Sequence, residues 1–204
     1  MRKHRTAMLR ACAVALLAMQ ASGTQADTRQ PEQIVKSTTE RVLQALGEEG
    51  AAKDRRQVHT VIEQMIVPHF DFEKMSQWVL GKNWKAATRE EQARFVGEFR
   101  TLLVRTYSSA LMQYTDQEVV FLPSRSDAGS GTTTVKTQVN PSDGPAVPID
   151  YRLYERDGVW KVFDVAVDGV SLVASYRTQF NEQISASGFG GLLNTLAERN
   201  QRLE

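Results

Sequence analysis

The chain has 204 residues, of which 41% are hydrophobic, and it carries 25 basic and 24 acidic side chains. A formal net charge of +1 excludes the strongly basic composition that drives non-specific binding to nucleic acids or anionic membranes. The length is that of one domain with a sizeable apolar core.

The N-terminus has the order of regions found in a secretory signal peptide. Basic residues within positions 1–10 precede an apolar run from Ala11 to Met19, and small and polar residues follow as far as Ala26. The apolar run is shorter than the about 20 residues that a membrane span requires. We therefore expect export, cleavage near Ala26, and a single mature domain over residues 27–204.

Cleavage at that point changes the cysteine content and the net charge of the chain. It removes the only cysteine, Cys12, so the mature chain has neither a disulfide nor a thiolate metal ligand. Cys12 also lies at the start of the apolar run, ahead of the expected cleavage point, whereas a lipid-modified cysteine would follow the run. The segment contains four of the basic residues and none of the acidic ones, so the mature net charge is about −3.

The first half of the mature chain has helical periodicity. Apolar residues recur at steps of three and four from Pro31 to Gly47, and again over 58–66, where Pro68 ends the second helix. A short helix is predicted over Asp71–Leu80, with Asp71 as its N-cap. The capping box Thr88-Arg-Glu-Glu91 then opens a long amphipathic helix that reaches Tyr114.

From Gln117 the apolar period changes to two, which predicts four strands, around 119–121, 135–139, 147–153 and 159–167. The tripeptide Arg156-Asp-Gly158 favours a tight hairpin between the last two strands. Short connections of this kind make the strands antiparallel.

A helix is expected from Ser171, with a break at 187–191 before a last helix. Helices around one meander predict an α+β domain in which a curved four-stranded antiparallel sheet is packed on one face by several helices. A concave sheet covered in this way encloses a cone, which side chains fill or an apolar ligand occupies.

Several blocks spread over nearly the whole mature chain carry a family resemblance. They are FDFEKM at 70–75, GKNW at 81–84, FVGEFRTLLVRTY at 95–107, WKVFDV at 160–165, GVSLV at 169–173 and YRTQF at 176–180. In this order the blocks resemble the periplasmic phospholipid-shuttle subunit of the lipid-asymmetry (Mla) transport system, also called the toluene-tolerance family.

The resemblance implies a nuclear-transport-factor-like cone whose deep apolar cavity takes lipid tails and leaves the headgroup in solvent. It implies a periplasmic phospholipid carrier that maintains outer-membrane lipid asymmetry, works as a monomer, and has no catalytic residue, cofactor, metal or nucleic-acid partner. The implied partners are an inner-membrane ABC transporter complex with a ring-forming substrate-binding subunit, and an outer-membrane lipoprotein in complex with a porin.

The long helix and the strands supply the candidate lipid-binding residues. The apolar stripe of the helix is expected to face inward-pointing strand residues, and the tyrosines are expected at the cavity rim, with their hydroxyls toward water or the lipid glycerol. Without the resemblance, the same stripe is the pattern of an ordinary packed core. The candidates are Phe99, Leu102, Leu103, Thr106, Tyr107, Ala110, Leu111, Val135, Ile149, Tyr151, Val165 and Val173.

Two other classes of function stay open at this level: an isomerase- or hydrolase-like enzyme on the same scaffold, and a lipid-free adaptor with a filled core. Asp164 and Asp168 share a strand parity and could form an acid–base pair, although Asp168-Gly169 fits a turn better. His69 and Asp71 lack a third metal ligand. Ser171 has no nucleophile-elbow context and fits a helix cap.

Overall fold

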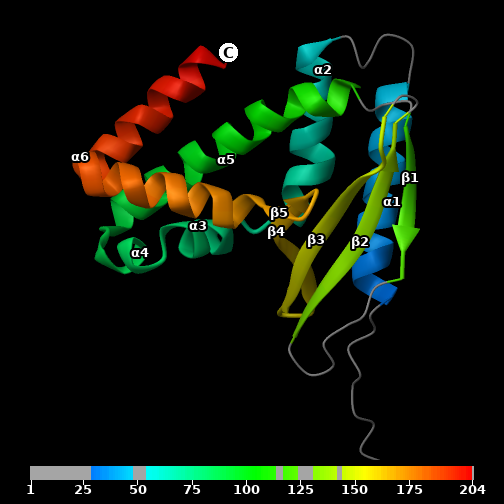
Figure 1. The fold of residues 1–204 in the computed structure, drawn as a ribbon, viewed down its shortest axis with the longest axis horizontal. Helices are drawn as coiled ribbons and strands as arrows, with labels where there is room; N and C mark the ends of the chain where they lie inside the picture. Colours follow the sequence, from blue (N-terminus) through cyan, green and yellow to red (C-terminus); the bar gives the residue numbers. More distant parts are fainter. Residues whose placement is uncertain (1–28, 48–53, 114–116, 124–130, 142–143, 204) are drawn as a thin grey trace, which may run out of the picture.

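The computed structural model describes residues 29–47, 54–113, 117–123, 131–141 and 144–203, and the expected signal peptide, residues 1–26, lies outside them. The described elements follow the predicted order of helices, then strands, then helix (Figure 1). The helices are α1 (Arg29–Gly47), α2 (Arg55–Val61), α3 (Phe72–Leu80), α4 (Lys82–Ala86), α5 (Arg89–Gln113) and α6 (Leu172–Arg202).

The sheet is an open antiparallel meander in the order β1-β2-β3-β4-β5, so the prediction of four strands was wrong by one. Asp168 and Gly169 adopt positive φ angles of 51° and 76°, and this turn brings Val170 back to pair with Val167. A two-residue strand is too short to give a period-two signal. The strands are β1 (Glu118–Leu122), β2 (Thr132–Asn140), β3 (Val147–Arg156), β4 (Val159–Val167) and β5 (Val170–Ser171).

The hairpin between β3 and β4 forms where the sequence predicted it. Asp157 and Gly158 have φ angles of 53° and 77°, the positive values that a type I′ turn requires at both central positions. Further along this pair the register shifts: Leu153 lies opposite Val162, but Arg152 lies opposite Asp164. The extra residue, Phe163, makes a β-bulge, and across it the strand residues that share one apolar cluster change from even numbers, Trp160 and Val162, to odd numbers, Val165 and Val167.

Helices contact both faces of the sheet, which corrects the expectation of helices on a single face. On one face, α1 packs Val35 against Val135 and Leu153, and Figure 1 shows α1 lying behind β1 and β2. Neighbouring residues of a strand point to opposite faces, and Tyr154 accordingly joins a different cluster with α3, α5 and α6. The second face is covered because α6 begins directly after β5 and turns back over β4.

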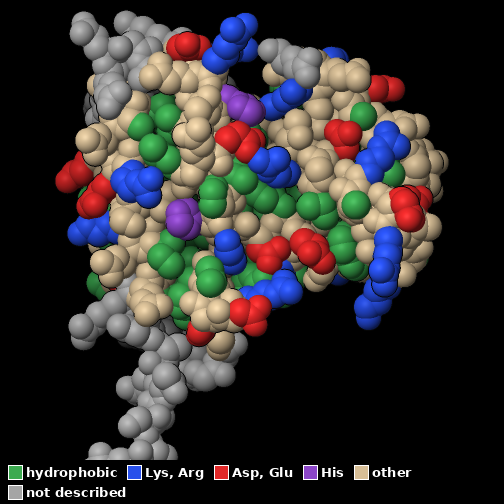
Figure 2. Space-filling model, turned by 180° about the vertical axis from the view of Figure 1, so that it is seen from behind, with side chains coloured by type: hydrophobic (Ala, Val, Ile, Leu, Met, Phe, Trp, Pro, Cys, Tyr) green, Lys and Arg blue, Asp and Glu red, His purple; other side chains and the backbone are tan. Residues whose placement is uncertain are grey.

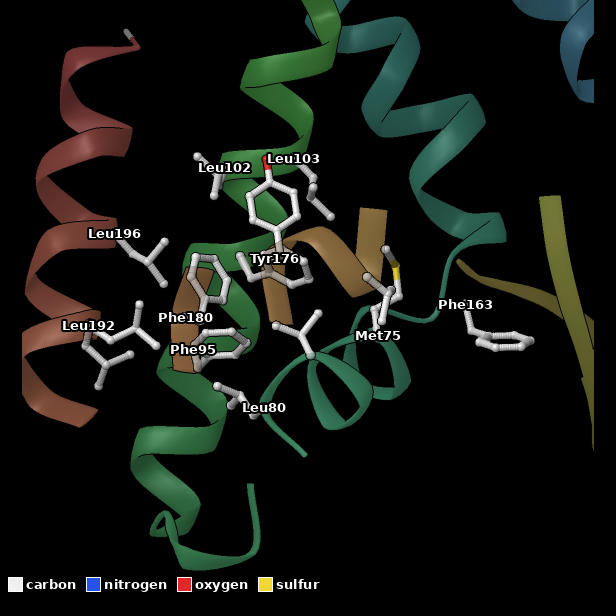
Figure 3. Packing of buried hydrophobic residues seen from close by; sticks show 14 of the residues in the cluster. Met75, Leu80, Phe95, Leu102, Leu103, Phe163, Tyr176, Phe180, Leu192 and Leu196 are labelled. Atoms are coloured by element: carbon white, nitrogen blue, oxygen red, sulfur yellow. The ribbon is translucent and has the colours of Figure 1, made fainter. Parts of the chain in front are cut away.

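A helical cluster of α3, α5 and α6 forms the largest buried group (Figure 3). The rings of Phe99 and Tyr176 meet edge to face at 5.3 Å, and those of Phe95 and Phe180 at 5.7 Å. The predicted capping box starts α5: the Glu91 amide donates to Thr88 Oγ1 at 3.2 Å, and the Thr88 amide to Glu91 Oε2 at 2.8 Å.

Two helix breaks also follow the sequence. The expected interruption at 187–191 is a kink at Gly188, whose φ of 73° and ψ of 175° are not helical. The second predicted helix is α-helical only to Val61 and continues as π-helix η2 (Ile62–Ile66) and 3₁₀-helix η3 (Val67–His69), which contains Pro68. Within the described residues, no helix is both long and apolar enough to cross a bilayer.

Candidate functional site

The structure places eight of the twelve candidate lipid-binding residues in two clusters. Four on α5 and α6 belong to the helical cluster, and the four on the strands belong to a sheet cluster that also contains Leu153 and Val162. Tyr107 is exposed, Thr106 is half-buried, and the side chains of Ala110 and Leu111 lie outside the described part. The helical-cluster members are Phe99, Leu102, Leu103 and Val173, and the sheet-cluster members are Val135, Ile149, Tyr151 and Val165.

Residual exposure distinguishes packed core from a surface that can receive a ligand. Phe99 and Leu102 have no accessible surface and Leu103 has 7%, so other protein atoms already surround these side chains and leave no room for a ligand. Several apolar residues of the sheet cluster are only partly buried. We call this set the open sheet surface, and it consists of Ile34, Phe121, Ile149, Tyr151, Val167 and Leu172.

Strand pairing places most of the open sheet surface on one face. Ile149 lies opposite Val167 across β3 and β4, and Phe121 lies opposite Thr137, which in turn pairs with Ile149. Residues directly opposite each other in antiparallel strands point to the same side. The result is a continuous apolar stretch across β1 to β4 on the side that α1 contacts.

Tyr151 lies deep within this stretch and not at an exposed rim as expected. Burial raises the pKa of its hydroxyl, and a hydrogen bond with Thr137 acts in the opposite direction. Thr137 itself is buried and donates through Oγ1 to the carbonyl oxygen of Ile149 at 3.0 Å. A neutral tyrosine that is deeply set yet keeps accessible surface is suited to line an apolar space.

Tyr107 of α5 has 37% of its surface exposed and lies beside Tyr176, a member of the helical cluster. Partial burial, followed by the neighbouring Tyr176 hydroxyl, raises its pKa to about 12, and Arg199 acts in the opposite direction. Both candidate tyrosines are therefore uncharged near neutral pH.

Sequence reasoning missed four members of the open sheet surface. Phe121 and Val167 continue the same alternation that selected Ile149 and Tyr151, so the period-two pattern could have included them. Ile34 and Leu172 come from helix starts, and no local signal shows that they meet the sheet.

The outer surface has no field of one charge on the face seen in Figure 2, where basic and acidic side chains are interspersed and apolar groups remain visible between them. The open sheet surface itself contains no ionisable carboxylate or amine. Such a lining suits a hydrocarbon ligand and offers nothing to hold a charged one.

The carboxylate and serine candidates for an enzyme have structural roles. Asp164 is 2% exposed and accepts hydrogen bonds from Ser171 Oγ at 2.7 Å and from the Val173 amide at 3.2 Å. Ser171 caps α6 by accepting from the Ala174 amide at 3.0 Å. Among the residues that the structure describes, no group of three metal-ligating side chains comes together.

These contacts predict a stability effect for Asp164→Ala. The change leaves the buried Val173 amide and the Ser171 hydroxyl without an acceptor, which is expected to lower the free energy of unfolding by about 2–3 kcal/mol. Chemical denaturation of the mature protein measures this loss. Asp168→Asn, at an exposed turn position, is the control and is expected to change stability by less than about 0.5 kcal/mol. A stable Asp164→Ala variant would contradict the structural role.

Comparisons with known proteins agree on one family. The family model for the MlaC protein matches residues 36–198. The toluene tolerance protein ttg2D of Pseudomonas putida is 26% identical over 161 residues, which cover 78% of this chain and 74% of that protein. The intermembrane phospholipid transport system binding protein MlaC of Haemophilus influenzae is 23% identical over 124 residues, which cover 59% and 58%.

A solved structure is similar over almost its full length. The phospholipid-binding protein from Ralstonia solanacearum, solved in complex with a phospholipid, is 34% identical with a TM-score of 0.78, and the match covers 84% of this chain and 97% of that one. The family match spans well over half of the chain, and the same fold recurs in that structure. The chain therefore belongs to the MlaC protein family.

Proposed function

We propose that the mature domain, residues 27–204, is a periplasmic carrier that moves phospholipid between the two membranes. It would exchange lipid with the ring-forming substrate-binding subunit of an inner-membrane ABC transporter complex and with an outer-membrane lipoprotein–porin complex, and so maintain outer-membrane lipid asymmetry. The observation that carries the proposal is the partly accessible, uncharged open sheet surface in a member of this family. The phospholipid in the similar Ralstonia solanacearum protein supports it.

Lipid tails need such a surface because their transfer through water is costly. Each methylene removed from water contributes about 0.8 kcal/mol, so two acyl chains represent on the order of 20 kcal/mol. Spontaneous desorption from a bilayer is therefore very slow, and a carrier must shield the tails. A protein cavity and a bilayer interior are both hydrocarbon-like, so the free-energy difference between them is small. The direction of transport would then come from the partner complexes.

In this proposal the sheet and the helices form a nuclear-transport-factor-like cone, and the open sheet surface lines the side of it that meets the tails. Ile149 and Tyr151 would contact the acyl chains, and the headgroup would stay in solvent. The carrier would act as a monomer without a cofactor, after removal of residues 1–26.

Lipid extraction from the exported mature protein tests the function directly. We expect mass spectrometry to find phospholipid in the purified protein, and we expect detergent stripping to lower its melting temperature. A ligand present at about 100 times its Kd stabilises the native state by about 2.7 kcal/mol, which is about 5–10 °C for a domain of this size. An adaptor with a filled core would contain no lipid and would melt at the same temperature before and after detergent treatment.

A further inference from the structure

The two halves of α1 pack into different apolar clusters. The first half buries Pro31 and Val35, and Val35 and Ile34 belong to the sheet cluster behind β1 and β2 (Figure 1). The second half buries Val42 and Leu46 against α2 and α5. We call this second group the α1–α2 cluster, and its buried members are Val42, Leu46, Val58, Val61, Ile62 and Val104.

No polar contact ties α1 to its neighbours. Within the described chain, no side chain of residues 30–47 forms a hydrogen bond or an ion pair with another element, and the Ser37 hydroxyl bonds only within α1. The start of α6 differs, because Ser171 and the Val173 amide both bond Asp164 of β4. Moving α1 away from the sheet therefore leaves no buried donor or acceptor without its partner.

The sequence between the two halves favours helix weakly. Ser37, Thr38 and Thr39 form a run of three residues with lower helix propensity than the lysine, glutamate, glutamine and leucine around them. The Ser37 hydroxyl also donates at 3.3 Å to the carbonyl oxygen of Ile34, and such back-bonding competes with helical hydrogen bonds. Residues 37–39 are thus the position where α1 bends most easily.

The first half of α1 lies on the surface that the acyl chains are proposed to occupy. Ile34 is part of the open sheet surface, and Val35 packs on Val135, which pairs with Tyr151. Chains that spread over this surface meet Ile34 and Val35 and have to displace them. The sheet then exchanges one apolar cover for another, so its own apolar side chains stay out of water.

The two ends of α1 are held differently. Cleavage near Ala26, as proposed, leaves only Asp27 and Thr28 before the helix, so the first half adjoins a chain end, where local opening is easiest. The second half is followed by the rest of the chain and contacts Val58, which has no accessible surface. Opening is therefore expected at the first half alone.

We infer that residues 30–36 of α1 form a lid on the lipid site, which bends away at residues 37–39 to admit acyl chains while Val42 and Leu46 keep the second half in place. This inference rests on the proposed function, because it supplies a route for the chains to the open sheet surface. After entry, Ile34 and Val35 pack on the chains and shield them from water.

Thiol labelling tests whether the lid opens. The mature chain has no cysteine, so Val35→Cys and Val42→Cys each carry a single thiol, at positions 6% and 4% exposed on the same helix. In stripped protein, Val35→Cys is expected to react with a maleimide at least about tenfold faster than Val42→Cys. Equal rates would mean that α1 opens as a whole, and would overturn the lid.

A cross-link tests whether the lid is the route for lipid. A short bifunctional thiol reagent joins Val35→Cys to Val135→Cys, and the control link joins Val42→Cys to Val61→Cys in the α1–α2 cluster. The first link is expected to slow uptake of a fluorescent phospholipid from phosphatidylcholine vesicles at least about tenfold, and the control link less than about twofold. Protein loaded before linking should likewise release its lipid slowly.

Two further controls keep the outcomes distinct. Val135→Cys with the reagent attached at one end shows whether the reagent itself blocks the site, and uptake by this form is expected to stay fast. If the Val35–Val135 link leaves uptake and release at the control rates, the lid is not the route. A wild type that never acquires phospholipid rejects the proposed function instead, and the labelling ratio still decides whether the lid opens.

Hydrogen exchange on the unmodified mature protein replaces the labelling if a cysteine variant melts far below the wild type. The amides of residues 34–38 are expected to exchange at least about tenfold faster than those of residues 43–46. Uniform protection along α1 would contradict the lid.

Discussion

Phe99→Ala is expected to lower the free energy of unfolding by about 3–5 kcal/mol, the range for removing a fully buried phenylalanine. The Phe99 ring has no accessible surface and meets three other aromatic rings, those of Phe95, Tyr176 and Phe180, at centroid distances of 5.3 to 5.8 Å. Its loss leaves a cavity between α5 and α6 that the rigid ring cluster cannot close. Denaturant titration of the stripped mature protein measures the effect without a contribution from lipid.

Val96→Ala is the control for this experiment, since Val96 lies on the same helix but is only partly buried. We expect a loss of no more than about 1 kcal/mol there. A small loss of unfolding free energy in Phe99→Ala would mean that the helical cluster is loosely packed and can behave as a ligand cavity. In that case the candidate residues on α5 would belong to the lipid site, although their burial indicates a packed core.

Ile149→Trp is expected to reduce bound phospholipid severalfold while the stripped protein keeps nearly the stability of the wild type. Ile149 is half-buried in the open sheet surface, so an indole at this position can occupy the space that the tails use. Leu153 is the control position, because it lies on the same strand and the same face as Ile149 but has no accessible surface. Leu153→Trp must force its neighbours apart and is expected to cost about 1–3 kcal/mol or more.

Two measurements on each variant separate these effects: phospholipid per protein by mass spectrometry, and melting temperature after detergent stripping. The proposal requires that Ile149→Trp lose mainly lipid and that Leu153→Trp lose mainly stability. If Ile149→Trp unfolds like Leu153→Trp and the folded fraction keeps its lipid, the open sheet surface is part of the packed core. The lipid would then have to be bound elsewhere.

Local chemistry in the sequence was sufficient to predict several caps, turns and breaks. The capping box at Thr88 and Glu91, the turn at Asp157 and Gly158, and the break at Gly188 each depend on side-chain hydrogen bonds or backbone angles within a few residues. Such signals act over short distances, so they survive in almost any tertiary context. The same holds for the change of period from helix to strand at Gln117.

The site was less predictable, because apolar periodicity shows which face of an element turns inward but not whether that face meets protein or an open space. Ile149 and Leu153 carry the same signal, and so do Phe99 and Tyr107 on α5, yet their exposure differs widely. Exposure depends on how distant segments pack, here α1 on the sheet and α6 on α5. A local pattern contains no information on those contacts.

The sequence by itself therefore determined the α+β class, the order of the elements, the structural roles of Asp71 and Ser171, and the family blocks. Only the tertiary structure decided that Phe163 forms a bulge, that helices contact both faces of the sheet, and that the two halves of α1 pack into different clusters. The physical reason is the range of the interactions. Caps and turns are local, whereas strand register, residual exposure and surface pockets arise between residues that are far apart in the chain.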